Sequence, residues 1–144
     1  MTTTIKAIIF DYGNVLLEWN PRHVYRHYFP DDNDGMEQFF HEVDFMGWNA
    51  QQDRGRTFKE GVADLSSQFP HHSHLIQAYH DHWKESIGNS LTGTVEILKE
   101  LKQAGYSLYG LTNWSAETFP YARAKYAFFD LFDDMVISGN VGHV

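Results

Sequence analysis

Three short apolar runs separated by helical patterns constrain the fold more than any other feature of the sequence. The runs are IKAIIF (5–10), YSLYGLT (106–112) and MVIS (135–138). The first is almost uninterrupted and rich in β-branched residues, which is typical of a strand buried on both faces of a parallel sheet. Helical patterns occupy TGTVEILKELKQAG (92–105) and SAETFPYARAKY (115–126). This alternation predicts an α/β fold with a partial doubly wound parallel sheet.

The ends of the two later helices carry recognisable signals. Gly105 follows the last helical residue at the position where a glycine commonly terminates a helix. Ser115 is the expected N-cap of the last helix, although Pro120 within that stretch makes its first turns hard to place.

The stretch from about residue 20 to residue 90 interrupts this alternation with helical patterns alone. Asn20 precedes a proline at a first helical position, and TFKE (57–60) has the form of a capping box. Leu75, Tyr79 and Trp83 recur at helical spacing and predict one buried face. No strand pattern is evident, so we expect residues 18–90 to form an inserted α-helical cap. The core then consists of residues 1–17 and 91–144.

Polar side chains follow the first two predicted core strands. Asp11 comes directly after the first strand, and Thr112 and Asn113 close the second. In open α/β sheets, ligands bind beyond the carboxyl ends of the strands, so we expect these residues to meet at one crevice. A carboxylate there can attack a phosphoryl or alkyl centre, while hydroxyl and N–H groups hold an anion. Gly13 leaves the backbone open, so its carbonyl can face a metal ion.

Composition narrows the range of partners. The formal net charge is -8, with no local basic patch, which disfavours nucleic acid. There is no cysteine, and the short apolar run near the N-terminus is too short for a signal peptide or a membrane span. We expect a soluble cytoplasmic protein with a small phosphorylated metabolite as its partner and no membrane partner.

The ordered set of motifs resembles the haloacid dehalogenase (HAD) superfamily of hydrolases with a helical cap. The resemblance is to the phosphatase-like branch whose first motif has the form D-x-G-N-V. The matching segments are FDYGNVL (10–16), DRGRTF (53–58), LTNWS (111–115) and VISGNVG (136–142).

The resemblance implies roles for four residues. Asp11 resembles the nucleophile and first Mg²⁺ ligand, and the Gly13 carbonyl resembles the second protein ligand of that ion. Thr112 resembles the hydroxyl that binds the phosphoryl group, with Asn113 as its supporting neighbour. The implied reaction is Mg²⁺-dependent hydrolysis of a phosphate monoester through an aspartyl-phosphate. The DRGRTF segment belongs to the cap, where the match implies an influence on substrate choice and no catalytic role.

Position 13 departs from the usual phosphatase pattern. Phosphatases of the superfamily commonly carry a second aspartate there as general acid and base, and this chain has Gly13. Proton transfer of that kind typically contributes about 10²–10⁴-fold to the rate. Dehalogenases of the superfamily also lack this aspartate, so hydrolysis of a 2-haloacid is the alternative activity.

The resemblance also implies a lysine–proline pair after the third core strand and a later acidic pair. Neither follows SGNVGHV in the 144 residues, and Asp133 and Asp134 precede the strand, at the wrong end of the sheet. We therefore expect a truncated chain that is inactive or weakly active and binds Mg²⁺ weakly. A non-catalytic fragment or association module is the further alternative, with self-association through the exposed edge of residues 6–10.

Histidines cluster at HHSH (71–74) and HDH (80–82) in the predicted cap. No cysteine accompanies them, and their spacing does not match a zinc motif. We therefore expect them to lie on a solvated helix face.

Overall fold

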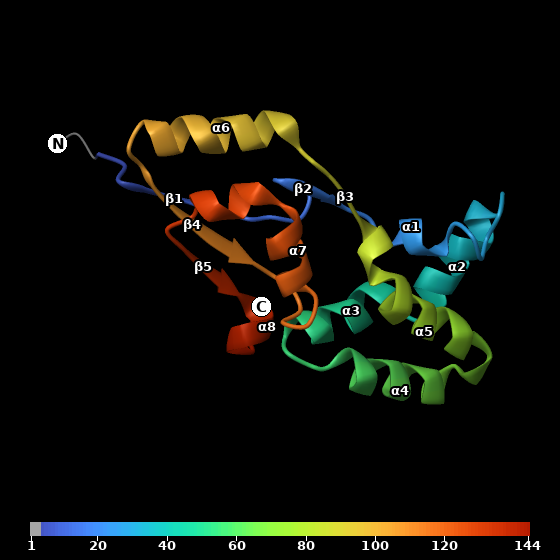
Figure 1. The fold of residues 1–144 in the computed structure, drawn as a ribbon. Helices are drawn as coiled ribbons and strands as arrows, with labels where there is room; N and C mark the ends of the chain where they lie inside the picture. The colour runs from blue at the N-terminus through green and yellow to red at the C-terminus, as the bar shows by residue number, and fades with distance from the viewer. Residues whose placement is uncertain (1–3) are drawn as a thin grey trace.

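The computed structural model describes residues 4–144 and contains the predicted parallel sheet (Figure 1). Three parallel strands lie in the order β1-β4-β5. Their bounds are Ala7–Phe10 for β1, Ser107–Thr112 for β4 and Asp134–Ile137 for β5. Each lies within two residues of its predicted place. The registers pair Phe10 with Gly110 and Thr112 with Ile137, so the three carboxyl ends lie along one edge.

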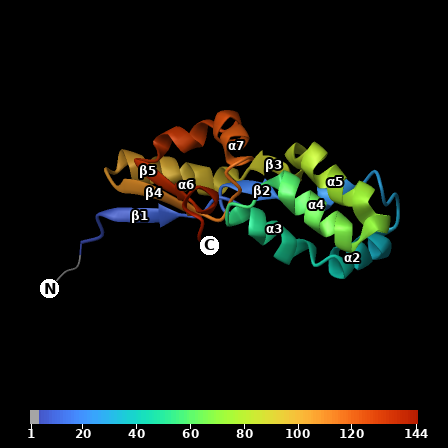
Figure 2. The ribbon, with the colours of Figure 1, turned by 90° about the horizontal axis from the view of Figure 1, so that it is seen from below.

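Helices cover one face of this sheet. They are α6 (Thr92–Gln103), α7 (Phe119–Lys125) and the short helix η3 (Ala127–Leu131) (Figures 1 and 2). Strand β4 alternates accordingly, with Leu108 buried and its neighbours Tyr109 and Leu111 exposed on the other side.

The expectation that the first strand is buried on both faces is therefore wrong. Ile9 is 65% exposed, whereas Ile8 packs against the core. β1 is an edge strand, and within residues 4–144 no helix covers its outer face. The apolar run carries no information about which of its residues face solvent.

The cap is an assembly of helices, as predicted. Their bounds are Arg22–Tyr25 (α1), Asn33–Glu42 (α2), Phe45–Asp53 (α3), Phe58–Gln68 (α4), Pro70–His72 (η1), Ser73–His82 (α5) and Trp83–Ser86 (η2). Leu75, Tyr79 and Trp83 are all buried, which confirms the predicted apolar face. Thr57 and Glu60 form the predicted capping box at the start of α4. Tyr79 packs edge-to-face against Phe45, and such aromatic contacts hold the cap together.

A two-stranded antiparallel ribbon connects the cap to the core, and the prediction of a purely helical insertion missed it. β2 (Leu17–Trp19) pairs with β3 (Ile87–Ser90). The backbone N–H of Asn20 donates to the carbonyl of Ser86 at 2.7 Å, at the cap end of the ribbon. Strands of this length leave no measurable alternation in a sequence, and Gly88 and Asn89 are residues that strands disfavour.

The other predicted helix ends agree with the structure in one of three cases. Gly105 has φ of +89° just beyond α6, the left-handed conformation expected of a terminating glycine. The side-chain oxygen of Asn20 accepts a hydrogen bond from the N–H of Arg22 at 3.0 Å, but α1 begins at Arg22 with Pro21 as its N-cap, one residue later than predicted. Ser115 does not cap α7, which begins at Phe119 after Thr118. Its hydroxyl accepts from the N–H of Glu117 at 3.2 Å within the preceding turn.

The last helix of the chain is short. α8 (Ser138–Val141) follows β5 directly. Between residues 4 and 144, no helix is long and apolar enough to cross a membrane.

Candidate active site

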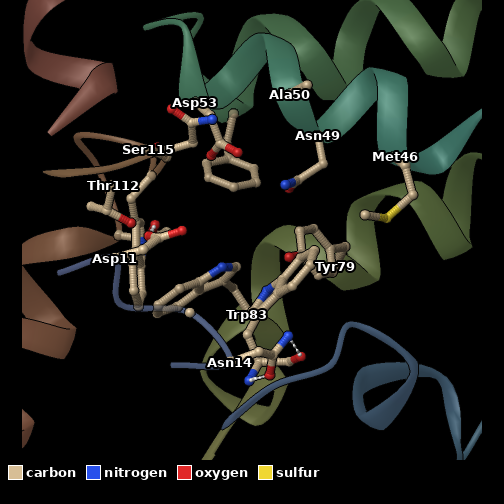
Figure 3. Close-up of a pocket in the computed structure, with 16 residues that line it drawn as sticks. Asp11, Asn14, Met46, Asn49, Ala50, Asp53, Tyr79, Trp83, Thr112 and Ser115 are labelled. Atoms are coloured by element: carbon tan, nitrogen blue, oxygen red, sulfur yellow. Dashed lines mark hydrogen bonds between the residues drawn. The ribbon is translucent and has the colours of Figure 1, made fainter. Parts of the chain in front are cut away.

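A pocket of about 320 Å³ lies where the cap meets the carboxyl edge of the sheet. Figure 3 shows its walls, with core residues on one side and residues of α3, α5 and η2 on the other. The side chains and backbone that line it come from Asp11, Gly13, Asn14, Trp19, Met46, Asn49, Ala50, Asp53, Phe58, Tyr79, Trp83, Thr112, Asn113, Trp114, Ser115 and Thr118. The structure thus brings all four sequence-predicted site residues to one pocket.

Asp11 is oriented by the residue that follows it. Tyr12 is fully buried against β4, and a Cβ on Gly110 would overlap its phenol ring. Because successive side chains of an extended chain point to opposite sides, a buried Tyr12 leaves Asp11 exposed towards the pocket. The N–H of Tyr12 donates to the Asp11 carboxylate at 2.7 Å and fixes the rotation of that side chain.

The loop after Asp11 is held by an asparagine in a left-handed conformation. Asn14 has φ of +56°, which asparagine adopts more readily than most residues. Its side-chain oxygen accepts from the N–H of Trp19 at 2.9 Å, and its amide nitrogen donates to the Trp19 carbonyl at 3.1 Å. This two-fold pairing closes the loop and presents the backbone of Gly13 to the pocket.

The second core loop is braced by the start of α8. Thr112 is buried at the end of β4, and Asn113 and Trp114 follow it into the loop. The N–H of Trp114 donates to the hydroxyl of Ser138 at 2.9 Å, and the N–H of Gly139 donates to the Trp114 carbonyl at 3.0 Å. The VISGNVG motif therefore acts on the pocket indirectly, by fixing the loop that carries Thr112 and Asn113.

Asp53 is a lining carboxylate that the sequence analysis did not assign to the site. It is the last residue of α3, and the backbone N–H of Ser115 in the core lies near enough to its carboxylate to favour the charged form. Figure 3 places it beside Ser115, on the side of the pocket that also holds Asp11 and Thr112. Burial raises the pKa of Asp53 to about 6, and the Ser115 N–H opposes part of that rise. The only sequence signal was its place at the head of DRGRTF, which pointed to the cap and not to the chemistry.

The rest of the pocket is largely apolar and aromatic. Trp19, Met46, Phe58, Trp83 and Trp114 contribute most of this wall. None of the described lining residues is a lysine, arginine or histidine.

One polar atom in this wall has no partner. The Tyr79 hydroxyl is fully buried, and no group within residues 4–144 forms a hydrogen bond with it. Burial raises the pKa of this phenol, so it stays neutral and able to donate a hydrogen bond. A buried hydroxyl of this kind is a site for a water molecule or a ligand oxygen.

The residues at the start of the first core loop offer donor atoms that suit a hard cation. Asp11 and Gly13 both line the pocket, and Mg²⁺ is bound in proteins through oxygen atoms, such as those of a carboxylate and a backbone carbonyl, while it keeps several waters. These residues therefore fit Mg²⁺ chemically. The Asp133–Asp134 pair does not belong to the site, because Asp133 binds the N–H of Leu108 and Lys102 at the other end of the sheet.

No protein-family model matches the chain. It is similar to the sesquiterpene phosphatase AstK of Aspergillus oryzae, with 29% identity over 145 residues, which cover 99% of this chain and 68% of that protein.

Solved structures of HAD enzymes have the same fold. The HAD family enzyme BT-2542 from Bacteroides thetaiotaomicron superposes with a TM-score of 0.71 at 16% identity, over 99% of this chain and 72% of its own. The same enzyme in complex with magnesium and inorganic phosphate gives 0.64 at 16% identity, over 98% and 72% of the two chains. The HAD-hydrolase YfnB of Bacillus subtilis, bound to magnesium, gives 0.67 at 20% identity, over 98% and 68%. The chain thus has the fold of HAD family enzymes, and the resemblance carried by its motifs is confirmed in its architecture.

Proposed function

We propose that this chain carries the nucleophile and phosphate-binding residues of a Mg²⁺-dependent phosphate-monoester hydrolase that acts through an aspartyl-phosphate on Asp11. The observation that carries the proposal is the convergence of Asp11, Gly13, Thr112 and Asn113 at one pocket on the carboxyl edge of the sheet. The similar protein AstK is a phosphatase, and BT-2542 binds magnesium and inorganic phosphate, which supports the same chemistry here.

The reaction would take place in two displacements at phosphorus. A carboxylate oxygen of Asp11 attacks the phosphoryl group, and the bond from phosphorus to the alcohol oxygen breaks. Water then attacks the aspartyl-phosphate, which releases inorganic phosphate and restores Asp11. The Thr112 hydroxyl and the N–H groups of the braced loop would donate hydrogen bonds to the phosphoryl oxygens, with Asn113 supporting that loop. Mg²⁺ held by Asp11 and the Gly13 carbonyl would neutralise charge on the transferring group.

The organic part of the substrate is expected to be apolar. The lining offers aromatic and aliphatic surface and, among the described residues, no basic side chain that would bind a second anionic group. AstK is named as a sesquiterpene phosphatase, which agrees with an apolar alcohol as the leaving group. The substrate class that fits is a small phosphorylated metabolite with one phosphate on an apolar carbon skeleton.

Turnover by these 144 residues is expected to be slow. The pocket contains two carboxylates, Asp11 and Asp53, and no lining lysine or arginine to offset their charge and that of the phosphate. Mg²⁺ binding is expected to be weak for the same reason, since a single carboxylate and one carbonyl supply its protein ligands.

The test measures Mg²⁺-dependent release of inorganic phosphate from an apolar alkyl monophosphate by the wild type and by Asp11→Asn. Mass spectrometry of the acid-quenched protein should detect a phosphoryl adduct on the peptide that contains Asp11. The substitution should abolish both signals, whereas Asp34→Asn, an exposed aspartate of the cap, should change neither. Phosphate release that persists in Asp11→Asn, or chloride release from a 2-haloacid in place of phosphate release, would show the proposal to be wrong.

A further inference from the structure

Resting on the proposed function, we propose that Asp53 is the general acid and base of the reaction, supplied by the cap. The position in the first motif that would hold a second carboxylate is Gly13, so the loop after β1 contains no group for proton transfer. Asp53 enters the same pocket from the opposite domain. It would protonate the leaving alcohol and later deprotonate the attacking water.

The position of Asp53 is fixed from both sides of the pocket. It ends α3, while the N–H of Ser115, which favours its charged form, lies three residues after Thr112 in the core. Nearby, Gly55 of the cap lies close to the backbone of Gly139 in the core. A Cβ added to Gly55 would lie 3.3 Å from the carbonyl oxygen of Gly139. Asp53 therefore lies at the contact between the end of α3 and the core.

The surroundings of Asp53 favour a carboxyl group that can change protonation near neutral pH. Its pKa is raised to about 6, chiefly because burial removes water from the charged form. The other titratable groups that line the same pocket are Asp11 and Tyr79, and neither is a cation. A general acid works best when its pKa lies near the operating pH, and a typical surface aspartate, with a pKa near 3.9, would seldom hold a proton there.

The proton balance is complete with these two aspartates. Asp11 forms its bond to phosphorus as the phosphorus–oxygen bond to the alcohol breaks, and the alkoxide oxygen takes the proton of Asp53 to leave as a neutral alcohol. In the second displacement the Asp53 carboxylate takes a proton from the attacking water. The new oxygen–phosphorus bond replaces the bond to Asp11, and both aspartates return to their starting states.

The experiment compares two substrates that differ in their need for a proton. An alkyl monophosphate has a poor leaving group that must be protonated, whereas p-nitrophenyl phosphate releases a stabilised phenolate. Asp53→Asn should lower the rate of phosphoenzyme formation from the alkyl ester, measured in single turnovers, by about 10²–10⁴-fold, and the rate from the nitrophenyl ester much less. Asp11→Asn should abolish both reactions, and Asp34→Asn should change neither.

The two proposals fail in different ways. Equal losses with both esters in this first step would show that Asp53 only positions the cap, and would overturn its role as acid while the role of Asp11 stood. Hydrolysis that is insensitive to Asp11→Asn would instead overturn the proposed function, and the role of Asp53 with it. Circular dichroism of each variant separates these outcomes from a loss of folding.

A second and independent observation lies on the far side of the cap, and from it we infer a binding site for a divalent transition metal such as Zn²⁺. The ligands are Glu42 at the end of α2 and the two histidines of η1, His71 and His72. One donor atom from each lies within 4.8 Å of the others. The expectation that these histidines merely cover a solvated helix face omitted Glu42, which is distant from them in the sequence.

The geometry directs both imidazoles to a common point. Nε2 of His71 and Nε2 of His72 each lie 3.1 Å from a different oxygen of the same Glu42 carboxylate. His72 is 19% exposed and packs edge-to-face on the ring of Phe39, so its orientation is fixed by the cap core. Two imidazoles and one carboxylate form a ligand set that zinc takes with a water in its fourth position. A small movement of the carboxylate would place the ion between the three side chains.

Titration calorimetry with Zn²⁺ and the visible spectrum of added Co²⁺ test this site directly. The wild type should bind one ion with micromolar affinity and unfold at a higher temperature in its presence. His71→Ala, His72→Ala and Glu42→Gln should each weaken binding by at least tenfold, and His80→Ala, which removes a cap histidine outside the cluster, should not. Absence of binding by the wild type, or an equal loss in His80→Ala, would overturn the inference.

Discussion

The backbone N–H of Phe58 in the cap donates a hydrogen bond of 2.6 Å to the carboxylate of Glu117 in the core. Phe58 is the first residue of α4, where helical N–H groups have no partner within the helix. A carboxylate at this position also interacts favourably with the positive end of the helix dipole. The contact thus caps a helix of one domain with a side chain of the other, close to the Asp53–Ser115 contact.

Replacement of Glu117 should weaken the attachment of the cap. We expect Glu117→Ala to lower the free energy of unfolding by about 1–2 kcal/mol, because a hydrogen bond to a charged acceptor is lost and a partly buried N–H is left without a partner. Glu117→Gln should lose less, since the amide oxygen still accepts. Urea unfolding measures the change, and hydrogen exchange should become faster at the start of α4 in particular. Unchanged exchange there would contradict the assigned role.

The stability of the protein should depend on pH through Asp53. With a folded-state pKa of about 6 against an ordinary value of 3.8, the folded chain holds this proton more tightly than the unfolded chain. The resulting stabilisation is complete below pH 3.8, declines as the pH rises, and is lost above pH 6. Asp53→Asn, which cannot ionise, should therefore be more stable than the wild type at pH 7.5 by about 1–2 kcal/mol. A fully buried group would change the free energy of unfolding by ~1.4 kcal/mol for each unit of pKa shift. Asp53 is only partly buried, so the expected change is smaller.

The measurement is the difference in unfolding free energy between wild type and Asp53→Asn at pH 4 and pH 7.5. Titrations elsewhere in the chain cancel in that difference. A gap that does not widen as the pH rises would show that the carboxyl group is not held in its neutral form.

Two glycines should respond in opposite directions to alanine. In Gly110→Ala the new methyl group would overlap the ring of Tyr12, so we expect a loss of about 1–3 kcal/mol from overpacking. Gly93→Ala introduces a methyl group with no atom within 4 Å, in the first turn of α6, and should stabilise by up to about 1 kcal/mol. Thermal unfolding of the two variants and the wild type measures both changes in stability. Equal effects would mean that Tyr12 can move aside without cost.

The free edge of β1 should promote association of two copies of the chain. Ile9 is 65% exposed beside unpaired backbone groups of an edge strand, which can pair with another strand. We expect a concentration-dependent dimer that Ile9→Lys abolishes. Ile97→Lys, at an exposed isoleucine of α6, should leave it intact. Sedimentation velocity over a range of concentrations tests this, and a wild type that stays monomeric throughout would refute it.

Much of the core was predictable because its signals are local. Apolar runs marked the three parallel strands, and the topology of a parallel sheet then placed Asp11 and Thr112 at the same edge. Gly105 ends its helix because glycine readily adopts a positive φ, which is a property of the residue type itself.

The features that the sequence did not predict depend on contacts between segments that are distant in the sequence. Ile8 and Ile9 are the same type of residue in the same apolar run. Only the packing of the sheet determines that Ile8 faces the core and Ile9 faces solvent. Asp53 enters the pocket because the end of α3 docks beside Ser115, and nothing within DRGRTF specifies that docking. Glu42 likewise meets His71 across a gap of 29 residues.

The ribbon formed by β2 and β3 means that the cap begins and ends at a single point, where Asn20 and Ser86 are hydrogen-bonded. From the standpoint of the core, the whole cap is therefore equivalent to the turn of a long hairpin. The entropy lost on closing such a loop grows only with the logarithm of its length, so that doubling it costs about 0.6 kcal/mol. Insertions and deletions in the cap can accordingly reshape the apolar wall of the pocket while the sheet, Asp11 and Thr112 keep their places.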